Sequence, residues 1–205
     1  MAKNPRASTR HRTPRVGGHD PGRRARSIDA EYSRARRVWS DVQDHLPRFV
    51  AAVLDCDALR VIELGSRGGV STRAWLYALS RTGGHLWTVD LDAAPRISTE
   101  EGVWTHVIGD DLSPEVLDVL PDEVDVLFID TSHVLAQTLR ELEVYSPRVR
   151  SGGVIFLHDT DLEYPDGCSR DEPFPVRTAI ERFTVSHGLT WVEHPGSYGL
   201  GEIVV

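Results

Sequence analysis

The stretch LRVIELGSRGGVSTRA, residues 59–74, decides the fold. Its apolar run at 61–64 predicts a buried strand, and a helix is predicted from Val70, with Ser71 or Thr72 as the expected N-cap. Three glycines separate the two elements: Gly65, Gly68 and Gly69. Glycine permits positive φ angles and close approach of a ligand to the backbone, and the free N–H groups of a helix start attract an anionic group. The stretch therefore predicts a ligand site at the carboxyl end of a parallel sheet.

The spacing of these glycines separates two kinds of nucleotide site. A dinucleotide-binding fingerprint reads G-x-G-x-x-G, which residues 63–69, ELGSRGG, do not match. An NAD-dependent oxidoreductase is therefore disfavoured, although it stays an alternative. The same residues resemble the first motif of class I S-adenosylmethionine-dependent methyltransferases. This resemblance implies a set of cofactor contacts at the turn: Glu63, Gly65, Ser66, Gly68, Gly69 and Ser71. A turn that only packs the chain is the other interpretation.

The composition is that of a globular α/β domain with an extension. The chain has 205 residues, of which 40% are hydrophobic and 26% charged, enough to bury a full core. No apolar run approaches the roughly 20 residues of a membrane span, and the basic start lacks the apolar segment of a secretory signal. The two cysteines, Cys56 and Cys168, indicate neither a disulfide framework nor a metal motif. We therefore expect a cytoplasmic protein without a membrane contact.

Charge divides the chain into two parts. Residues 1–26 hold eight Lys and Arg residues and one Asp, a net charge of +7. Because the whole chain has a net charge of −8, residues 27–205 carry −15. The basic segment lacks apolar periodicity and is predicted to be a disordered tail. Residues 27–205 are predicted to be one class I methyltransferase domain. Its acidic character argues against a nucleic-acid groove, so contact with nucleic acid is expected, if anywhere, through the tail.

Hydrophobic periodicity predicts the remaining elements. Apolar residues at steps of three and four over 28–53, including Trp39, predict a helical region that Pro47 splits or restarts. Further helices are predicted over 134–145 and 175–186. Strands are predicted over these ranges: 85–90, 103–108, 124–129, 154–157, 189–193 and 199–205. Strands that alternate with helices are typical of a doubly wound α/β fold.

Acidic residues stand at the ends of the second and third predicted strands. Asp90 ends the strand over 85–90, where a doubly wound fold binds ribose hydroxyls through charge-assisted hydrogen bonds; a solvated turn residue is the alternative. In the methyltransferase family, a side chain after the third strand lies beside the adenine. The resemblance implies that Asp110 or Asp111 takes this place, although either also suits a plain loop carboxylate.

A second region strengthens the resemblance. The runs VDVLFID, residues 124–130, and SGGVIFLHDT, residues 151–160, resemble strands four and five of small-molecule O-methyltransferases. The likeness covers about residues 60–161 and is closest to the metal-dependent, antibiotic-tailoring group that includes macrolide-sugar O-methyltransferases and cephalosporin-hydroxylase-like proteins. It implies a Rossmann-like, doubly wound, seven-stranded sheet of order 3-2-1-4-5-7-6 with an antiparallel last strand. It also implies S-adenosylmethionine as the cofactor.

Candidate catalytic residues cluster at the ends of predicted strands four and five. Asp130, His158 and Asp159 are predicted to bind a divalent cation, Mg²⁺ first and Mn²⁺ as the ion that better tolerates imidazole. Together with Asp130, His133 is the predicted catalytic residue, as the general base, because its position resembles that of the catalytic lysine of catechol-type relatives. Capping of the following helix is the alternative.

The chain departs from both patterns: Thr160 follows Asp159 where catechol-type enzymes have Asn, and His158 precedes it where the tailoring group has an acidic residue. A metal-free Asp159–His158 acid–base pair therefore stays open.

These observations predict methyl transfer from S-adenosylmethionine to a hydroxyl of a small secondary metabolite or sugar. The expected partner is a small-molecule substrate, and an assembly of identical chains stays open. Besides the oxidoreductase, two alternatives remain: a nucleic-acid methyltransferase and a non-catalytic domain that keeps the cofactor cleft.

Overall fold

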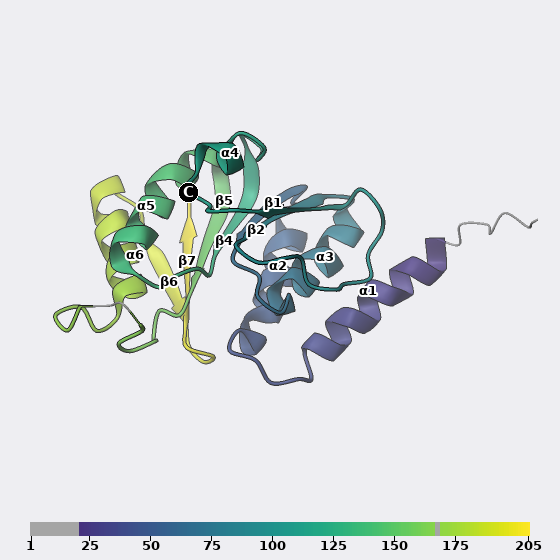
Figure 1. Cartoon of the computed structure of the whole chain (residues 1–205), viewed down its shortest axis with the longest axis horizontal. Helices are drawn as coiled ribbons and strands as arrows, with labels where there is room; N and C mark the ends of the chain where they lie inside the picture. The colour runs from purple at the N-terminus through teal and green to yellow at the C-terminus, as the bar shows by residue number, and fades with distance from the viewer. Residues whose placement is uncertain (1–20, 167–168) are drawn as a thin grey trace, which may run out of the picture.

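A seven-stranded sheet forms the centre of the computed structural model, which describes residues 21–166 and 169–205 (Figure 1). The strand order is β3-β2-β1-β4-β5-β7-β6, as predicted. All neighbouring strands are parallel except β7, which is antiparallel to both β5 and β6. The strands are β1 (Arg60–Leu64), β2 (His85–Asp90), β3 (Trp104–Ile108), β4 (Val124–Ile129), β5 (Val149–His158), β6 (Trp191–His194) and β7 (Leu200–Val204).

Helices cover both faces of the sheet, so the doubly wound prediction is confirmed (Figure 1). One face packs against α1 (Pro21–Ala35), α2 (Leu46–Asp55) and α3 (Val70–Thr82). The other packs against α4 (Pro114–Leu117), α5 (Leu135–Tyr145) and α6 (Pro175–His187). Two short 3₁₀ turns, η1 (Gln43–His45) and η2 (Ser146–Arg148), complete the set.

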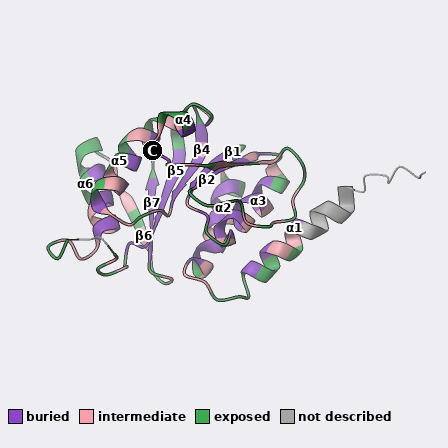
Figure 2. Ribbon diagram, viewed as in Figure 1, coloured by how far each residue is buried: buried purple, intermediate pink, exposed green. Residues whose placement is uncertain are grey.

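The buried strands read as apolar runs because both of their faces are covered. In β4, Val126 and Phe128 join the core under α1–α3, whereas Leu127 and Ile129 join the core under α4–α6. The ring of Phe49 stacks on a tryptophan of α3 with 4.4 Å between centroids. Figure 2 shows the central strands as buried along their length. The sheet is therefore a rigid platform, and the side chains at its strand ends are held in fixed positions.

The region before β1 differs from the predicted continuous face. Helix α1 ends at Ala35, and Pro47 lies in the first turn of α2, where its missing N–H costs no hydrogen bond. Trp39, expected on the apolar face, lies between the two helices and is 80% exposed. Helix α1 begins at Pro21, ahead of the expected domain start at residue 27. Residues 1–20 lie outside the described residues, so the basic tail stays a prediction.

Strand β5 is longer than predicted, because it begins at Val149 rather than Val154. The added part contains a register shift opposite Val124 and Val126, and Gly152 adopts a φ of +75° there. Where the pairing is irregular, the side chains do not alternate regularly, so the start of the strand cannot be recognised from the sequence pattern. Within the described ranges, none of the helices combines the length and apolar character needed to cross a bilayer.

Candidate active site

The ends of β4 and β5 place two carboxylates and two imidazoles together. The two strands are parallel neighbours in which Ile129 pairs with Leu157, so the residues that follow them lie side by side. Asp130 and Asp159 are the carboxylates, and Asp159 adopts a left-handed φ of +65° that turns the chain directly after β5. The structure therefore places Asp130 and Asp159, two of the predicted site residues, side by side.

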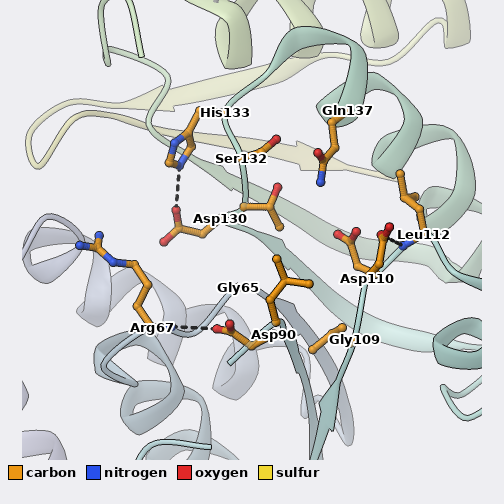
Figure 3. A pocket seen from close by; sticks show the side chains of 14 residues that line it. Gly65, Arg67, Asp90, Gly109, Asp110, Leu112, Asp130, Ser132, His133 and Gln137 are labelled. Carbon is orange, nitrogen blue, oxygen red and sulfur yellow. Dashed lines mark hydrogen bonds and ion pairs between the residues drawn. The ribbon is translucent and has the colours of Figure 1, made fainter. Parts of the chain in front are cut away.

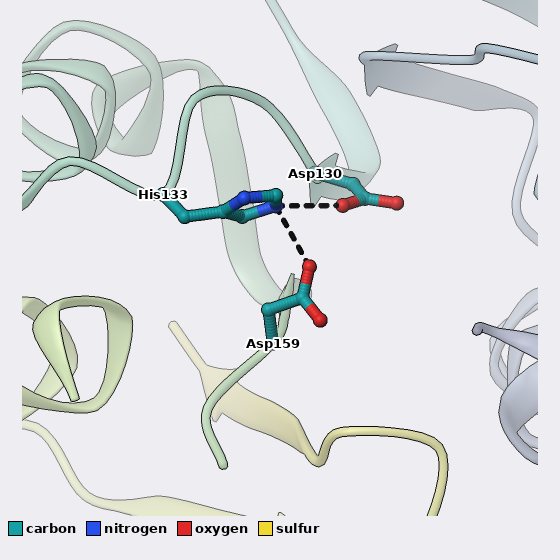
Figure 4. Close-up of side chains that lie close together, drawn as sticks. All are labelled: Asp130, His133 and Asp159. Carbon is teal, nitrogen blue, oxygen red and sulfur yellow. Dashed lines mark hydrogen bonds and ion pairs between the residues drawn. The ribbon is translucent and has the colours of Figure 1, made fainter. Parts of the chain in front are cut away.

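His133 lies between the two carboxylates (Figure 4). Its Nε2 is 2.7 Å from Asp159 Oδ2 and 3.3 Å from Asp130 Oδ1. A left-handed φ of +56° at His133 brings the ring back over the end of β4. Burial disfavours the charged imidazole, but the hydrogen bonds to Asp130 and Asp159 outweigh burial and raise the pKa of His133 to about 9. Without a cation, His133 is therefore protonated at neutral pH and cannot accept a proton.

His158 is buried on the far side of the same cluster. Its Nε2 lies 2.8 Å from the Ser197 carbonyl oxygen and 3.1 Å from that of Asp41, which identifies Nε2 as a donor. Its Nδ1 is buried without a hydrogen-bond partner, 3.2 Å from Asp159 Oδ2 and 3.5 Å from Asp130 Oδ1. Burial opposes the charge on the ring, but the two carboxylates raise the pKa of His158 to about 11. The two carboxylates therefore favour a positive charge at Nδ1, either a bound proton or a cation.

Both carboxylates are held in the charged state. Burial alone would raise the pKa of Asp130, but the hydrogen bond from His133 and the nearby imidazole of His158 lower it well below the ordinary value. The same two imidazoles lower the pKa of Asp159 against the effect of its burial. Asp130 Oδ, His133 Nε and Asp159 Oδ atoms lie within 4.8 Å of one another, a spacing that one metal ion can bridge. The predicted set is Asp130, His158 and Asp159; the group with this spacing contains His133 and does not contain His158.

The glycine turn after β1 packs tightly against the end of β4. Gly65 adopts a φ of +84°, and a Cβ there would lie 1.9 Å from the Asp130 carbonyl oxygen. Gly69 is the N-cap of α3 with a φ of +72°. The space beside Gly68 is open, since a Cβ there would meet no atom within 4 Å. Gly65 therefore serves the packing of the turn, whereas the backbone at Gly68 is open to a ligand. The two interpretations of the glycines apply to different residues.

The expected N-cap of α3 is wrong, and Glu63 explains why. The Glu63 carboxylate is fully buried and accepts hydrogen bonds from the hydroxyls of Ser71 at 2.6 Å, Thr72 at 2.8 Å and Thr88 at 2.8 Å. The hydroxyls of Ser71 and Thr72 are thus directed to this side chain, and Gly69 caps the helix instead. Burial raises the pKa of Glu63 to about 7 despite these donors. Through these hydrogen bonds, Glu63 fixes the start of α3 against the sheet.

Asp90 holds the turn from the end of β2. Its Oδ2 accepts from the Ser66 N–H at 2.7 Å, the Ser66 hydroxyl at 2.8 Å and the Arg67 N–H at 3.0 Å. Its Oδ1 accepts only the Asp92 N–H, at 3.0 Å. Burial would raise the pKa of Asp90, but the hydrogen bonds from Asp92, Ser66 and Arg67 lower it. Oδ1 is therefore the oxygen with capacity left for a ligand hydroxyl.

Two adjoining pockets open beside the turn. The larger, of about 420 Å³, lies between the ends of β1–β4, and Figure 3 shows Asp90, Asp110 and Asp130 around it. The smaller, of about 260 Å³, lies between the turn and residues 39–42. Asp130 and Arg67 line both pockets. The carboxylate–imidazole cluster therefore stands at the junction of the two pockets.

The predicted cofactor residues divide between these pockets. The larger is lined by four of them: Gly65, Asp90, Asp110 and Asp111. The smaller is lined by Ser66, Gly68 and Ser71. Glu63 and Gly69 line neither pocket.

A comparison with known protein families assigns this architecture. Residues 62–160 match the profile of a family described as a methyltransferase domain. The matched segment runs from β1 through the glycine turn to the end of the cluster. These residues therefore match a methyltransferase domain. Comparison with curated protein sequences gives no match.

Several solved structures share the fold of this chain. A candidate O-methyltransferase from Klebsiella pneumoniae is 23% identical, with a TM-score of 0.63 over 93% of this chain and 92% of that chain. The O-methyltransferase TomG from Streptomyces achromogenes is 17% identical, with a TM-score of 0.59 over 93% and 92%. The methyltransferase MycE from the mycinamycin pathway is 19% identical, with a TM-score of 0.64 over 87% of this chain and 54% of that chain.

Some residues of the candidate site carry no signal in the sequence. Gln137 lines the larger pocket from α5, and nothing in its sequence context marks it. Arg67 belongs to the glycine turn, and its guanidinium lies 2.6 Å from Asp41 Oδ2 across the mouth of the smaller pocket. Asp41 also offers its carbonyl oxygen to His158. These contacts join segments far apart in the chain, so only the folded structure reveals them.

Proposed function

We propose that this chain transfers the methyl group of S-adenosylmethionine to a hydroxyl of a small molecule, assisted by a divalent cation. The observation that carries the proposal is the position of Asp130, which lines both pockets and belongs to the carboxylate–imidazole cluster. In a molecule that fills both pockets, the middle portion lies beside Asp130. The sulfonium lies at the middle of S-adenosylmethionine, between the nucleoside and the amino-acid end.

The two pockets suit the two ends of this cofactor. In the larger pocket, Asp90 Oδ1 is available for ribose hydroxyls, and the exposed Asp110 is available for an amino group of the base. In the smaller pocket, Ser71 lies at the start of α3, where backbone N–H groups favour a carboxylate. A structurally similar protein contains the cofactor: TomG is described in complex with S-adenosylmethionine.

Calorimetry with S-adenosylhomocysteine and NAD tests this assignment. We expect S-adenosylhomocysteine to bind at least about 100-fold more tightly than NAD, because the turn lacks the dinucleotide spacing. Asp90→Asn should weaken S-adenosylhomocysteine binding by about 10-fold to 100-fold, because charge-assisted hydrogen bonds are lost. Asp92→Asn, a matched change at an exposed neighbour, should alter binding by less than about threefold. Equal affinity for NAD would contradict the proposal.

The cluster suits a divalent cation. Its donors are Asp130, His133 and Asp159, and the unpartnered, buried Nδ1 of His158 faces them. A mixed set of carboxylates and imidazoles favours Mn²⁺ or a similar first-row ion over Mg²⁺, although MycE is described in complex with Mg. A cation held there would lower the pKa of an acceptor hydroxyl and stabilise the resulting oxyanion.

The residues of the cluster also determine where the acceptor's proton goes. Methyl transfer forms a C–O bond as the C–S bond breaks, so the sulfonium becomes a neutral thioether and the hydroxyl releases its proton. His133 can take that proton only as the neutral imidazole. A His133 ring that binds the cation through Nε2 cannot take the proton at the same atom, so the proposed base role of His133 requires that Asp130, Asp159 and His158 hold the cation. Orientation by the cluster supplies a large part of the acceleration.

We expect cation binding to strengthen as the pH rises. The pKa values of His133 and His158 are about 9 and about 11, so each ring that becomes a ligand must first lose a proton. The apparent affinity for Mn²⁺ should rise by up to about tenfold per pH unit for each proton displaced between pH 7 and pH 8.5. Titration calorimetry in buffers of different ionisation enthalpy counts these protons. EDTA should stop turnover and Mn²⁺ should restore it; full turnover in excess EDTA would refute the cation.

The acceptor is proposed to be a phenolic, glycosyl or polyketide hydroxyl. The neighbours act in such settings: TomG is described as involved in tomaymycin synthesis, and MycE as bound to mycinamycin VI. A panel of the three acceptor types with a labelled methyl donor identifies the class. Transfer to a nitrogen acceptor alone would refute O-methylation. The cytoplasmic location and the assembly of identical chains stay predictions.

A further inference from the structure

Two buried carboxyl groups face each other behind the wall of the larger pocket. Asp111 belongs to the loop 109–113, which follows β3 and lines that pocket. Glu141 lies on α5. The two residues are 7% and 0% exposed, and their carboxyl groups lie within hydrogen-bonding reach of each other. Neither residue belongs to the catalytic cluster.

Each carboxyl group has one buried oxygen without a partner. Asp111 Oδ2 and Glu141 Oε2 are both buried and accept no hydrogen bond. The other oxygen of Glu141 accepts from the Thr131 hydroxyl at 2.7 Å and from the Gln137 amide at 2.9 Å. Two ionised carboxylates can only accept, so a hydrogen bond between them requires a proton. Leaving both oxygens charged and unpaired in the interior would be strongly unfavourable.

The surroundings supply no positive charge to either carboxyl. In the part of the chain that the structure describes, neither residue takes part in an ion pair. Asp110 stands beside Asp111 in the loop, and from α5 the Tyr145 hydroxyl donates to the Asp111 backbone carbonyl at 2.5 Å. From η2, Arg148 donates to the carbonyls of Leu117, Leu120 and Pro121 instead. Burial and the neighbouring Glu141 raise the pKa of Asp111 to about 8.

We infer that Asp111 and Glu141 share one proton at neutral pH and that this proton fastens the loop 109–113 to α5. The shared proton belongs to the pair and not to either residue alone. It is a positioning pair, since Glu141 does not line the pocket and acts through the loop. Loss of the proton leaves two facing charges that push the loop away from α5. The inference rests on the proposed function for the identity of the ligand, so cofactor affinity should fall in alkaline solution.

The test compares three proteins by calorimetry with S-adenosylhomocysteine from pH 6.5 to pH 9.5. For the wild type, the dissociation constant should rise by about tenfold between pH 7 and pH 9. Glu141→Gln places a permanent N–H opposite Asp111, so its dissociation constant should match the wild type at pH 7 and change by less than about twofold over the range. Glu143→Gln, the same change on the exposed face of α5, should keep the wild-type profile.

A flat wild-type profile, a Glu141→Gln variant that keeps the rise, or a Glu143→Gln variant that loses it would overturn the inference. Absence of binding at every pH would instead refute the proposed cofactor, and thermal unfolding then tests the pair. The folded pair holds a proton that the unfolded carboxyls lack at neutral pH, so the stability it adds disappears as the pH rises through about 8. The wild-type melting temperature should then fall more steeply between pH 7 and pH 9 than that of Glu141→Gln; parallel curves would overturn the pair.

Discussion

Asp159→Asn is expected to lower turnover by about a thousandfold while leaving S-adenosylhomocysteine binding within about threefold of the wild-type value. Asp159 Oδ2 contacts both His133 and His158 at the cluster, and loss of its charge removes a cation ligand. Asp159 lines neither pocket, so the cofactor should bind as before. Steady-state kinetics with a saturating acceptor and calorimetry with S-adenosylhomocysteine measure the two effects separately.

The matched control is Asp161→Asn, two residues further along the chain. Asp161 is exposed and pairs with Arg177, and an exposed pair contributes at most about 1 kcal/mol. Its turnover should stay within about threefold of the wild-type value. If Asp159→Asn kept full turnover, the cluster would have no part in the chemistry. If it lost cofactor binding as well, the separation of pocket and cluster would be wrong.

Gly65→Ala is expected to lower the free energy of unfolding by about 3 to 5 kcal/mol and to abolish S-adenosylhomocysteine binding. The added Cβ would overlap the Asp130 carbonyl oxygen, at 1.9 Å, and the φ of +84° is unfavourable for alanine. The chain must therefore separate β1 from the end of β4, and that movement displaces Asp130. Urea denaturation followed by circular dichroism measures the stability change.

Gly83→Ala is the control that separates the strain of a positive φ from the overlap of an added Cβ. Gly83 also has a left-handed φ, of +77°, but a Cβ there would meet no atom within 4 Å. Its substitution should cost only about 1 kcal/mol and leave cofactor binding intact. Equal losses of stability in the two variants would show that the close approach of Gly65 to Asp130 is unimportant.

The sheet could be predicted from the sequence because its signals are local. Each parallel strand is an apolar run bounded by turn residues, and the chain from Leu59 to Ala74 contains strand, turn and helix in succession. Asp130 and Asp159 follow such runs, so their meeting could be inferred from the topology. Trp39 illustrates the limit of periodicity, since a residue in step with an apolar face lies exposed where the helix ends.

The details of the site depend on contacts that no local pattern encodes. The left-handed turn at His133 moves its ring between the carboxylates, and a positive φ at a non-glycine residue leaves no mark in the sequence. The hydroxyls of Ser71 and Thr72 suit an N-cap by type, yet the buried Glu63 takes both. The Asp111–Glu141 pair joins a loop to a distant helix, so neither residue indicates the other.

The imidazole of His158 makes completion of the site depend on the synthesis of Ser197. Its Nε2 reaches carbonyl groups at Asp41, 117 residues away along the chain, and at Ser197, 39 residues away. The Ser197 hydroxyl also donates to Asp44, 153 residues away. Contacts of such wide separation are slow to form. A ribosome-bound chain that has not yet reached Ser197 therefore has the glycine turn but lacks the partner that fixes His158, so it should be catalytically silent.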